Sequence, residues 1–497
     1  MVPDTPDPLA PFPAPTPPEG AGDPQTLLRS LPPVNEVLEV VGDDDLALAS
    51  REEWVVEIRQ ALADLRAKVL GGGMGPVVLA KAKAPTALRA TALRRIERKR
   101  DPGCVRVVNG VGVVLHTNLG RAAMPPAVHE ALANEAHGYQ LLAADATGGE
   151  RSPRERHVEQ LFQQLTGCEA ATVVNNNAAA TMIGLAALAR GREVIVARGQ
   201  LVEIGGAYRI PEVMEQSGAI LREVGTTNRV HLKDYENAIN ENTALILRVH
   251  TSNYRVEGFQ GEVSLEDMVA LGRQYGVRVM DDLGSGALVS TKLQGLPEEE
   301  PLIAGSVEAG ADLITASGDK LIGGPQMGIM VGTRECVARV RAHPLYRAVR
   351  CGKLDLISME ATLRLFLNQD TLVETHPTYR MLTAQQPELR ERAEALATRL
   401  RDSAAHGVDV QIADVGDAVG AGSMPTVELP GAAVSLASSA IEAGELARRM
   451  RAHRPPVFSQ VHDGRVFVHV RTLQPGDEDD VVAAVEAASH DPSSQES

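Results

Sequence analysis

Between about residue 105 and residue 373, short runs of apolar and β-branched residues alternate with amphipathic stretches of ten or more residues. Several runs have the length of a buried strand; they cover residues 171–174, 194–197, 219–224, 244–249, 277–280, 313–316 and 328–331. The stretches between them, such as residues 178–190 and 265–275, have the apolar spacing of helices. This βαβ alternation predicts a mostly parallel sheet with helices on both faces. Ligands of such sheets bind at the carboxyl ends of the strands, so the residues that follow each run are candidates for a site.

The chain on either side of this region has a different character. The first 24 residues are rich in proline and poor in apolar residues, which predicts a disordered tail. Ser50 and Glu53 form a capping-box pattern ahead of helically spaced apolar residues. We therefore expect a tail at 1–24, a helical module at 25–80, a basic linker at 81–105, the sheet domain at 106–373, a smaller α+β domain at 374–489 and a polar tail at 490–497.

The charge balance limits the classes of partner. The 497 residues carry 49 Lys and Arg against 65 Asp and Glu, a net charge of −16. This acidic balance argues against a protein that coats nucleic acid indiscriminately, and we expect no DNA partner. No apolar stretch approaches the length of a membrane span, and no signal peptide opens the chain, so we expect a cytoplasmic protein with no membrane partner. The four cysteines lack metal-site spacing, so we expect no metal.

Residues 81–100 are an exception to the acidic balance. They contain eight basic residues and one acid, Glu97. A charge run of this kind is often a solvated linker helix. It is also what a surface that contacts a phosphate backbone needs, and the sequence leaves both interpretations open.

Lys320 occupies an unusual position between two apolar runs. It lies in the segment ASGDKLIGGPQMG, residues 316–328, with glycines on both sides. A lysine in an ordinary surface turn is the common case. A lysine held in a pocket has a lowered pKa, and its amine can attack a carbonyl group to form a Schiff base. The second interpretation requires partners elsewhere in the chain.

Three other strand ends carry suitable partners. The run that ends at residue 174 is followed by three asparagines and three alanines that open a helix, where Asn177, Ala178 and Ala179 can cradle a phosphate with backbone N–H groups. Asp282 follows a central strand, where a carboxylate is costly unless it meets a cation such as a pyridinium nitrogen. Ser317 lies three residues before the lysine and can reach a phosphate.

Each of these features has an ordinary alternative: a helix cap, a surface pair of acids, or a turn serine. Their combination in this order on a βαβ chain is far more specific. A phosphate cradle, a strand-end aspartate and a later strand-end lysine together predict a site for pyridoxal 5′-phosphate, in which Lys320 forms the Schiff base.

Longer motifs resemble one enzyme family. The segment NGVGVVLHTNLGRA (residues 109–122) is similar to the start of the catalytic core of the bacterial selenocysteine synthase, or L-seryl-tRNA(Sec) selenium transferase, family. The same holds for VVNNNAAA, DDLGSGALV, SGDKLIGGPQMGIMVG, HPLYRAVR and MEATLRL. The similarity is nearly continuous from about residue 106 to residue 371 and weaker toward both termini.

The resemblance implies a fold type I pyridoxal-phosphate transferase core with a mostly parallel, seven-stranded type of sheet between helices. It implies that Lys320 is the Schiff-base lysine and Asp282 the partner of the pyridinium nitrogen. It also implies that Arg121, Arg347 and Arg350 hold the selenium donor, selenophosphate. A surface or ion-pair role is the ordinary alternative for each arginine. The helical module at 25–80 is then the part that docks tRNA, and the protein a homo-oligomer, a decamer by analogy with bacterial members.

The implied reaction converts L-seryl-tRNA(Sec) to L-selenocysteyl-tRNA(Sec). Hydroxide is eliminated to give aminoacrylyl-tRNA, to which selenium from selenophosphate is added. One alternative is a pyridoxal-phosphate ammonia-lyase or β-eliminase of the same group that acts on a small molecule without tRNA. Another is a non-catalytic RNA-binding protein that has kept the fold.

Some positions depart from the family pattern. Cys351 and Gly352 follow Arg350 where Val-Asp is usual, residues 149–157 differ from the expected continuation, and Gln460 replaces an arginine. We interpret Cys351 as a packing residue. An esterified substrate has no free carboxylate, so Arg471 cannot hold one, and the sequence leaves its role open.

Overall fold

The computed structural model describes residues 23–490, except residues 72, 73, 101, 205, 207, 257, 293, 297, 298, 404, 406 and 421. The expected tails at 1–24 and 490–497 therefore lie almost entirely outside the described residues. The chain divides into two compact units, Met1–Val105 and Arg106–Ser497.

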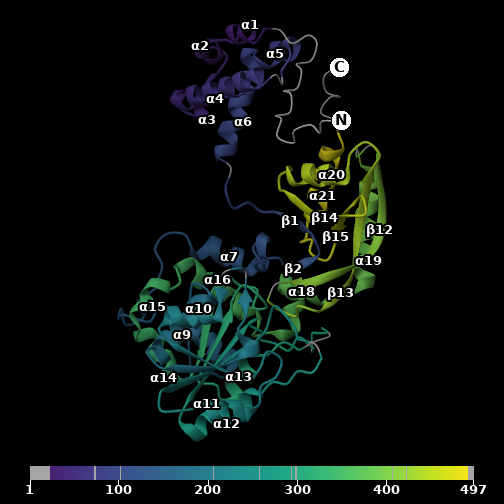
Figure 1. The fold of residues 1–497 in the computed structure, drawn as a ribbon. Helices are drawn as coiled ribbons and strands as arrows, with labels where there is room; N and C mark the ends of the chain where they lie inside the picture. The colour runs from purple at the N-terminus through teal and green to yellow at the C-terminus, as the bar shows by residue number, and fades with distance from the viewer. Residues whose placement is uncertain are drawn as a thin grey trace, which may run out of the picture. The chain divides into compact units, whose positions relative to one another are not determined.

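The larger unit is built on a seven-stranded sheet with the strand order β3-β11-β10-β9-β8-β4-β7 (Figure 1). Its strands are β3 (Ala170–Val174), β4 (Glu193–Ala197), β7 (Ile220–Val224), β8 (Thr243–Val249), β9 (Arg278–Gly284), β10 (Leu313–Ser317) and β11 (Gly328–Gly332). Only β11 runs antiparallel to its neighbours. The expectation of a mostly parallel sheet is confirmed.

Helices bury both faces of this sheet because its inner strands are apolar throughout. Every residue of β3, β10 and β11 is buried. Ala171 and Val173 belong to one apolar cluster with α8, α12, α13 and α16, whereas Ala170 and Val174 belong to another with α9, α10 and α14. Because successive side chains of a strand point to opposite faces of the sheet, one strand contributes residues to both apolar clusters.

The helices around this sheet are α7 (Pro126–Glu135), α8 (Arg156–Thr166), α9 (Asn177–Ala189), α10 (Ile210–Ser217), α11 (Leu232–Ala238), α12 (Leu265–Tyr275), α13 (Ile303–Ala309), α14 (Arg334–Ala342), α15 (Pro344–Val349), α16 (Lys353–Leu365), α17 (Leu372–Thr375) and α18 (Pro377–Thr383). Short elements complete this part: η1 (Thr117–Leu119), η2 (Arg198–Gln200), η3 (Gln369–Thr371) and the pair β5 (Glu203–Ile204) and β6 (Tyr208–Arg209).

A second sheet of six strands has the order β1-β14-β15-β13-β12-β2. It comprises β1 (Val108–Gly110), β2 (Val113–Leu115), β12 (Val408–Gly420), β13 (Glu428–Ser438), β14 (Val457–His462) and β15 (Arg465–His469). The helices α19 (Gln386–Asp402), α20 (Ala443–Arg451) and α21 (Asp477–Ser489) share an apolar cluster with it. In Figure 1 the long β12–β13 hairpin stands out in yellow-green.

The first strands after residue 106 join this second sheet rather than the large one. Val108 pairs in register with Val457, and Val113 with Ala418. We expected residues 106–373 to form one sheet domain, but β1 and β2 are three residues long, too short for a periodic pattern to reveal their partners. The polypeptide thus contributes to the small sheet before it enters the large one.

The smaller unit is helical, with α1 (Pro24–Arg29), α2 (Val34–Leu38), α3 (Asp43–Leu48), α4 (Arg51–Leu70), α5 (Pro76–Ala82) and α6 (Pro85–Arg100). Ser50 caps α4 by accepting a hydrogen bond from the backbone of Glu53. Leu88, Ala92 and Ile96 follow each other at intervals of four along α6 and are buried in one cluster with α4. The segment expected to be a basic linker is therefore largely a packed helix of this unit.

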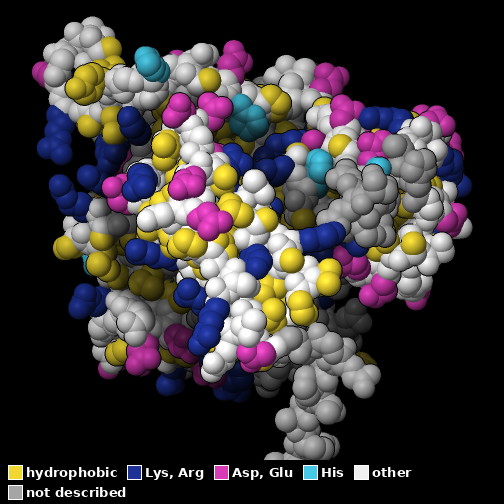
Figure 2. All heavy atoms as spheres, turned by 90° about the horizontal axis from the view of Figure 1, so that it is seen from above, with side chains coloured by type: hydrophobic (Ala, Val, Ile, Leu, Met, Phe, Trp, Pro, Cys, Tyr) yellow, Lys and Arg dark blue, Asp and Glu magenta, His cyan; other side chains and the backbone are white. Residues whose placement is uncertain are grey.

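Ion pairs neutralise much of the basic character of α6. Arg89 pairs with Asp45, Arg95 and Lys99 both pair with the buried Glu57, and Arg100 pairs with Glu53. Figure 2 shows basic and acidic side chains interspersed over the face that it presents. None of the described helices is long and apolar enough to cross a membrane.

Candidate active site

Lys320 lies in the turn between β10 and β11, at the carboxyl end of the large sheet. Only 7% of the residue is exposed, and burial is the main cause of the lowered pKa of its amine. Asp282 opposes this shift, and the positive charge of Arg121 adds to it. No hydrogen bond or ion pair holds the amine among the described residues. The surface-lysine alternative is thereby excluded, because the amine is enclosed and not tied to a structural partner.

A glycine of the small-sheet region lies directly against this amine. Gly422 has a φ of +83°, and a Cβ at that position would lie 2.2 Å from Nζ of Lys320. Any larger residue would displace the lysine. The C-terminal region thus closes the site over Lys320, a contribution that sequence reasoning missed because Gly422 lies 102 residues from the lysine in an unremarkable loop.

Asp282 lies on β9, beside the strand that leads to Lys320, and accepts three hydrogen bonds. The donors are Nδ2 of Asn177 at 2.8 Å, Oγ1 of Thr181 at 3.0 Å and Oγ1 of Thr315 at 3.1 Å. Burial raises the pKa of Asp282, and these donors and Lys320 act against that rise. A buried carboxylate with only neutral donors in contact is an arrangement that a cationic ring nitrogen would complete.

Two neighbouring asparagines have different roles at the start of α9. Asn176 is the N-cap, and its side chain accepts the N–H of Ala179 at 2.8 Å. Asn177 points to Asp282 instead, and its Oδ1 is buried without a partner. Among the described residues, the N–H groups of Asn177 and Ala178 have no acceptor. Of the three amides in the predicted cradle, those of Asn177 and Ala178 are free to bind a phosphate, and that of Ala179 is used by the cap.

Ser317 ends β10 and is buried, three residues before the lysine. Gly286 approaches it closely: with a φ of +73°, its Cβ position would lie 2.5 Å from the carbonyl oxygen of Ser317. The Gly284-Ser285-Gly286 turn after Asp282 is thus required for β9 and β10 to end side by side.

These groups fit pyridoxal 5′-phosphate. A helix N-terminus with free amides suits the phosphate, a buried carboxylate suits the ring nitrogen, and an enclosed amine suits the aldehyde carbon. The unpartnered Oδ1 of Asn177 and the carboxylate of Asp282 are both polar groups that protein contacts alone do not fully satisfy. No cluster of acidic, histidine or cysteine side chains suitable for a metal occurs in the described part of the chain.

Arg121 lies next to the lysine turn. Its Nη1 bonds Oδ2 of Asp319 at 2.5 Å, and its Nε is buried without a partner. The residue has a φ of +61°, a strained value for a side chain of this size. A guanidinium held in this way, with an unused donor, suits an anionic ligand.

Arg347 and Arg350 lie in the segment that pairs with the end of β3, just before the predicted phosphate cradle. Arg347 is in α15, and the backbone of Arg350 pairs with Val174 at the end of β3. Both side chains are exposed and make no ion pair among the described residues. No contact there joins either of them to Arg121. The structure thus places one predicted donor-binding arginine beside Lys320 and two beside the start of α9.

The departures from the family pattern have structural roles. Cys351 is buried in the large apolar cluster, and burial raises the pKa of its thiol to about 12, as expected for a packing residue. Gln460 donates to the carbonyl of Val111 at 2.7 Å. Arg471 is almost fully buried and bonds Asp417 and the carbonyls of Met381, Ala384 and Pro430. The sequence left the role of Arg471 open. In the structure Arg471 joins α18 to the β12–β13 hairpin.

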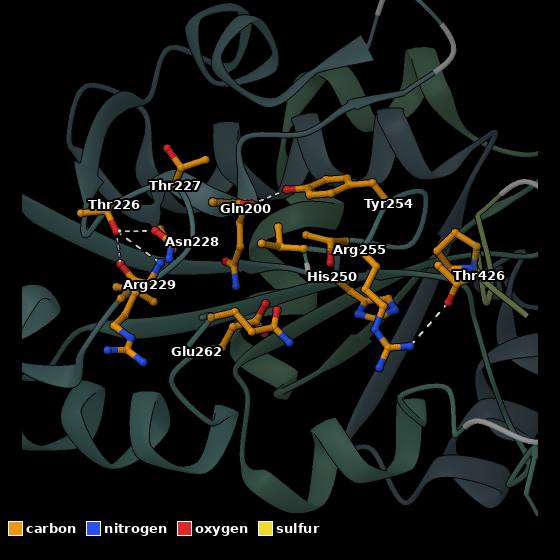
Figure 3. A pocket seen from close by; sticks show the side chains of 18 of the residues that line it. Gln200, Thr226, Thr227, Asn228, Arg229, His250, Tyr254, Arg255, Glu262 and Thr426 are labelled. Carbon is orange, nitrogen blue, oxygen red and sulfur yellow. Dashed lines mark hydrogen bonds between the residues drawn. The ribbon is translucent and has the colours of Figure 1, made fainter. Parts of the chain in front are cut away.

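A polar cavity of about 260 Å³ lies at the carboxyl ends of β4 and β8 (Figure 3). His250 and Glu300 form its inner wall, with Nε2 of His250 3.3 Å from a Glu300 oxygen. The second Glu300 oxygen accepts the N–H of Met424 at 2.7 Å. Burial would raise the pKa of Glu300, but His250 and Met424 together lower it. Sequence reasoning missed this pair, although His250 directly follows a predicted strand and could have been found there.

Comparison with known proteins places this geometry in a family. Residues 107–474 match the family model described as L-seryl-tRNA selenium transferase. The L-seryl-tRNA(Sec) selenium transferase of Caldanaerobacter subterraneus is 43% identical over 463 residues, which cover 93% of this chain and 98% of that protein. The enzyme of the same name from Geobacter metallireducens is 44% identical over 465 residues, 93% and 99% of the two chains. The chain belongs to this family.

Among solved structures, a D-glucosaminate-6-phosphate ammonia-lyase matches with a TM-score of 0.53 and 20% identity. The match covers 79% of this chain and 98% of the ammonia-lyase. At this identity the likeness concerns the fold alone. It agrees with the expected fold type I architecture.

Proposed function

We propose that the protein converts L-seryl-tRNA(Sec) to L-selenocysteyl-tRNA(Sec), with pyridoxal 5′-phosphate as cofactor and selenophosphate as selenium donor. Membership of the selenium transferase family, at 43% identity over nearly the whole chain, carries this proposal. The enclosed Lys320 and the buried Asp282 support it, because they are the residues that the cofactor chemistry needs.

The cofactor would be held by Lys320, by Asp282 at the ring nitrogen and by the start of α9 at the phosphate. When bound, it supplies an electron sink that stabilises negative charge at the substrate Cα. The Lys320 amine has a lowered pKa, so a larger fraction of it is uncharged near neutral pH and can accept the Cα proton. The serine hydroxyl takes up a proton and leaves from Cβ as water, and selenium bonds to Cβ in its place. The phosphorus–selenium bond of the donor is broken by water, which releases phosphate, and Cα regains a proton.

The selenium donor carries a phosphate, so it needs permanent positive charge. We assign its binding to Arg121, Arg347 and Arg350, whose guanidinium groups offer forked donors to phosphate oxygens. The unused Nε of Arg121 and the absence of ion pairs at Arg347 and Arg350 among the described residues support this assignment. All three groups lie in the larger unit.

The helical unit of residues 23–105 is the proposed tRNA-docking module. Four basic side chains of α6 are engaged with Glu53, Glu57, Asp45 and Asp64, so the docking surface must use others, such as Lys83, Arg94 and Arg98. A homo-oligomer, with the decamer of the family as the expected size, would present this surface in several copies. Sedimentation of the purified protein measures that size directly. We place the reaction in the cytoplasm.

The structural similarity to an ammonia-lyase supports a shared fold, but it does not support the ammonia-lyase activity for this chain. A non-catalytic RNA-binding role does not explain why a lysine is enclosed without a structural partner, opposite a buried carboxylate. The decisive assay supplies purified protein with seryl-tRNA(Sec) and selenophosphate and measures selenocysteyl-tRNA by mass spectrometry. Failure to form it under conditions where the cofactor is bound would reject the proposal.

The arginine assignment has its own test, Arg347→Ala. Because Arg347 is exposed and makes no described ion pair, the variant should fold normally. We expect loss of the serine hydroxyl to continue within about threefold of the normal rate, while selenium incorporation falls by about 100-fold, equivalent to ~2.7 kcal/mol. The exposed Arg334, whose backbone merely opens α14, provides the control as Arg334→Ala. A variant that blocks loss of the hydroxyl would show that Arg347 does not serve the donor.

A further inference from the structure

The polar cavity lined by His250 and Glu300 has no role in the chemistry described so far. It lies at the carboxyl ends of β4 and β8, where the turn after β7 (residues 226–230) and Met424–Thr426 complete its wall. Its volume of about 260 Å³ is close to the lower limit of ligand pockets, about 300 Å³, so it suits a ligand no larger than one nucleotide. It is too small for a folded RNA or protein element.

The inner wall of the cavity is part of the catalytic site. The backbone N–H of His250 donates to the carbonyl of Asp282 at 2.9 Å. The charge of Glu300 acts on Lys320, and Met424 is two residues from Gly422, which touches the lysine amine. The cavity and the catalytic groups thus share a wall, formed by His250, Glu300 and the segment that follows Gly422.

The buried carboxylate of Glu300 disfavours an anion at the inner end of the cavity. Its pKa is lowered, and it lies 3.3 Å from Nε2 of His250. Arg471, the buried arginine of the neighbouring region, has its donors engaged by Asp417 and backbone carbonyls. Arg255 is the basic side chain that lines this end of the cavity, and its guanidinium is engaged, donating to Oγ1 of Thr426 at 3.5 Å. The inner end suits a neutral group that offers hydroxyls to carboxylates, as a ribose esterified at one hydroxyl does.

The opposite end of the cavity has a different chemistry. In Figure 3 the side chains of Thr226, Asn228 and Arg229 cluster there, away from Arg255 and Thr426. Oγ1 of Thr226 donates to the carbonyl of Arg229 at 2.9 Å and fixes the turn. The guanidinium of Arg229 is exposed and has no ion pair among the described residues. Such a group suits one phosphate.

We propose that this cavity receives the 3′-terminal nucleotide of the acylated RNA, with its ribose against His250 and Glu300 and its 5′-phosphate at Arg229. The assignment rests on the proposed function, because it assumes that the amino acid arrives as an RNA ester. An amino acid that arrives as an ester has no free carboxylate. The proposal therefore explains why the protein can place the carboxylate of Glu300 in this cavity. It also gives the terminal nucleotide a recognition site separate from the helical unit.

The test uses three probes with the cofactor-loaded full-length protein, each titrated by calorimetry. The first is 3′-deoxy-3′-(L-serylamino)adenosine 5′-phosphate, the second is the same compound without the phosphate, and the third is L-serine amide. We expect the first to bind at least 100-fold more tightly than serine amide. Arg229→Gln should weaken the first probe about tenfold, ~1.4 kcal/mol, and leave the second unchanged. Arg222→Gln, an exposed arginine on β7 outside the cavity lining, is the matched control and should change neither.

Two results would overturn the proposal. One is equal affinity for the nucleotide probe and for serine amide in a protein that still converts seryl-tRNA(Sec). The other is an Arg229→Gln variant that binds both adenosine probes as the unaltered protein does. If the protein converts no seryl-tRNA(Sec) but a small amino compound instead, the proposed function fails, and that outcome is distinct from both.

Discussion

Lys320 and Arg471 are two buried cations of the same unit with opposite environments. Arg471 is surrounded by acceptors: Asp417 and three backbone carbonyls engage its guanidinium. Lys320 has no such contact among the described residues, and burial lowers its pKa. A buried charge that is fully bonded serves stability, whereas one that is enclosed but left without a bond is available for chemistry. Burial alone therefore does not distinguish a structural cation from a reactive one.

The largest expected effect follows from removing the unbonded cation. Lys320→Ala should abolish selenium transfer and the visible absorbance of the Schiff base between lysine and cofactor, because no second amine is enclosed beside Asp282 in the described site. Stability should change by less than about 1 kcal/mol, since no described hydrogen bond is lost. Absorbance scans and thermal melts of the cofactor-free protein measure the two effects separately. A variant that retained turnover would contradict the role of Lys320.

The opposite pattern is expected for the bonded cation. Arg471→Met leaves Asp417 buried, with His469 as its remaining side-chain partner at 2.6 Å. Breaking a buried ion pair from one side costs about 3–5 kcal/mol, so we expect a large loss in the free energy of unfolding, measured by denaturant titration. At temperatures where the variant remains folded, its cofactor absorbance should be normal. If the Arg471→Met variant had normal stability but no cofactor absorbance, the structural role of Arg471 would be contradicted.

The same contrast shows what could be predicted from the sequence. The strand ends could be located because buried parallel strands form apolar runs, and the residues after them identified Lys320, Asp282 and Ser317. Chain proximity also gave the start of α9, where Asn176 is the N-cap and Asn177 donates to Asp282. Gly422, Glu300 and the acceptors of Arg471 could not be predicted, because each depends on contacts between segments 41 to 124 residues apart that no local pattern encodes.

The basic helix α6 packs within the helical unit in a way that its charge run did not reveal. Its charge run suggested a solvated linker or an RNA surface, but local sequence does not reveal that Glu57 is buried opposite Arg95 and Lys99. The apolar spacing of Leu88, Ala92 and Ile96 was the signal that the segment packs. Opposite charges from a second helix turned much of a predicted binding surface into part of a folded unit.

The smallest predicted effect concerns a third kind of cation. Arg89 is half-exposed and forms an ion pair with Asp45. Arg89 holds the pKa of Asp45 below its usual value of 3.8. A carboxyl whose pKa is lowered by folding stabilises the folded state above its unfolded pKa, and this contribution is lost as pH falls below about 3.8. Asp45→Asn should therefore destabilise the helical unit by about 1 kcal/mol at pH 7, a cost reduced by the solvent exposure of Arg89, and the difference should shrink as pH falls toward 3.

Trp54 makes this measurement specific. It is the single tryptophan of the chain and is fully buried, and its indole N–H donates to the carbonyl of Asp45 at 3.0 Å. Its fluorescence thus reports the unfolding of the helical unit within the full-length protein. Asp64→Asn, which removes a half-exposed partner of Arg95, should cost less than about 0.5 kcal/mol and serves as the control. A pH-independent difference between Asp45→Asn and the unaltered protein would show that packing around Trp54, and not the ion pair, carries the stability.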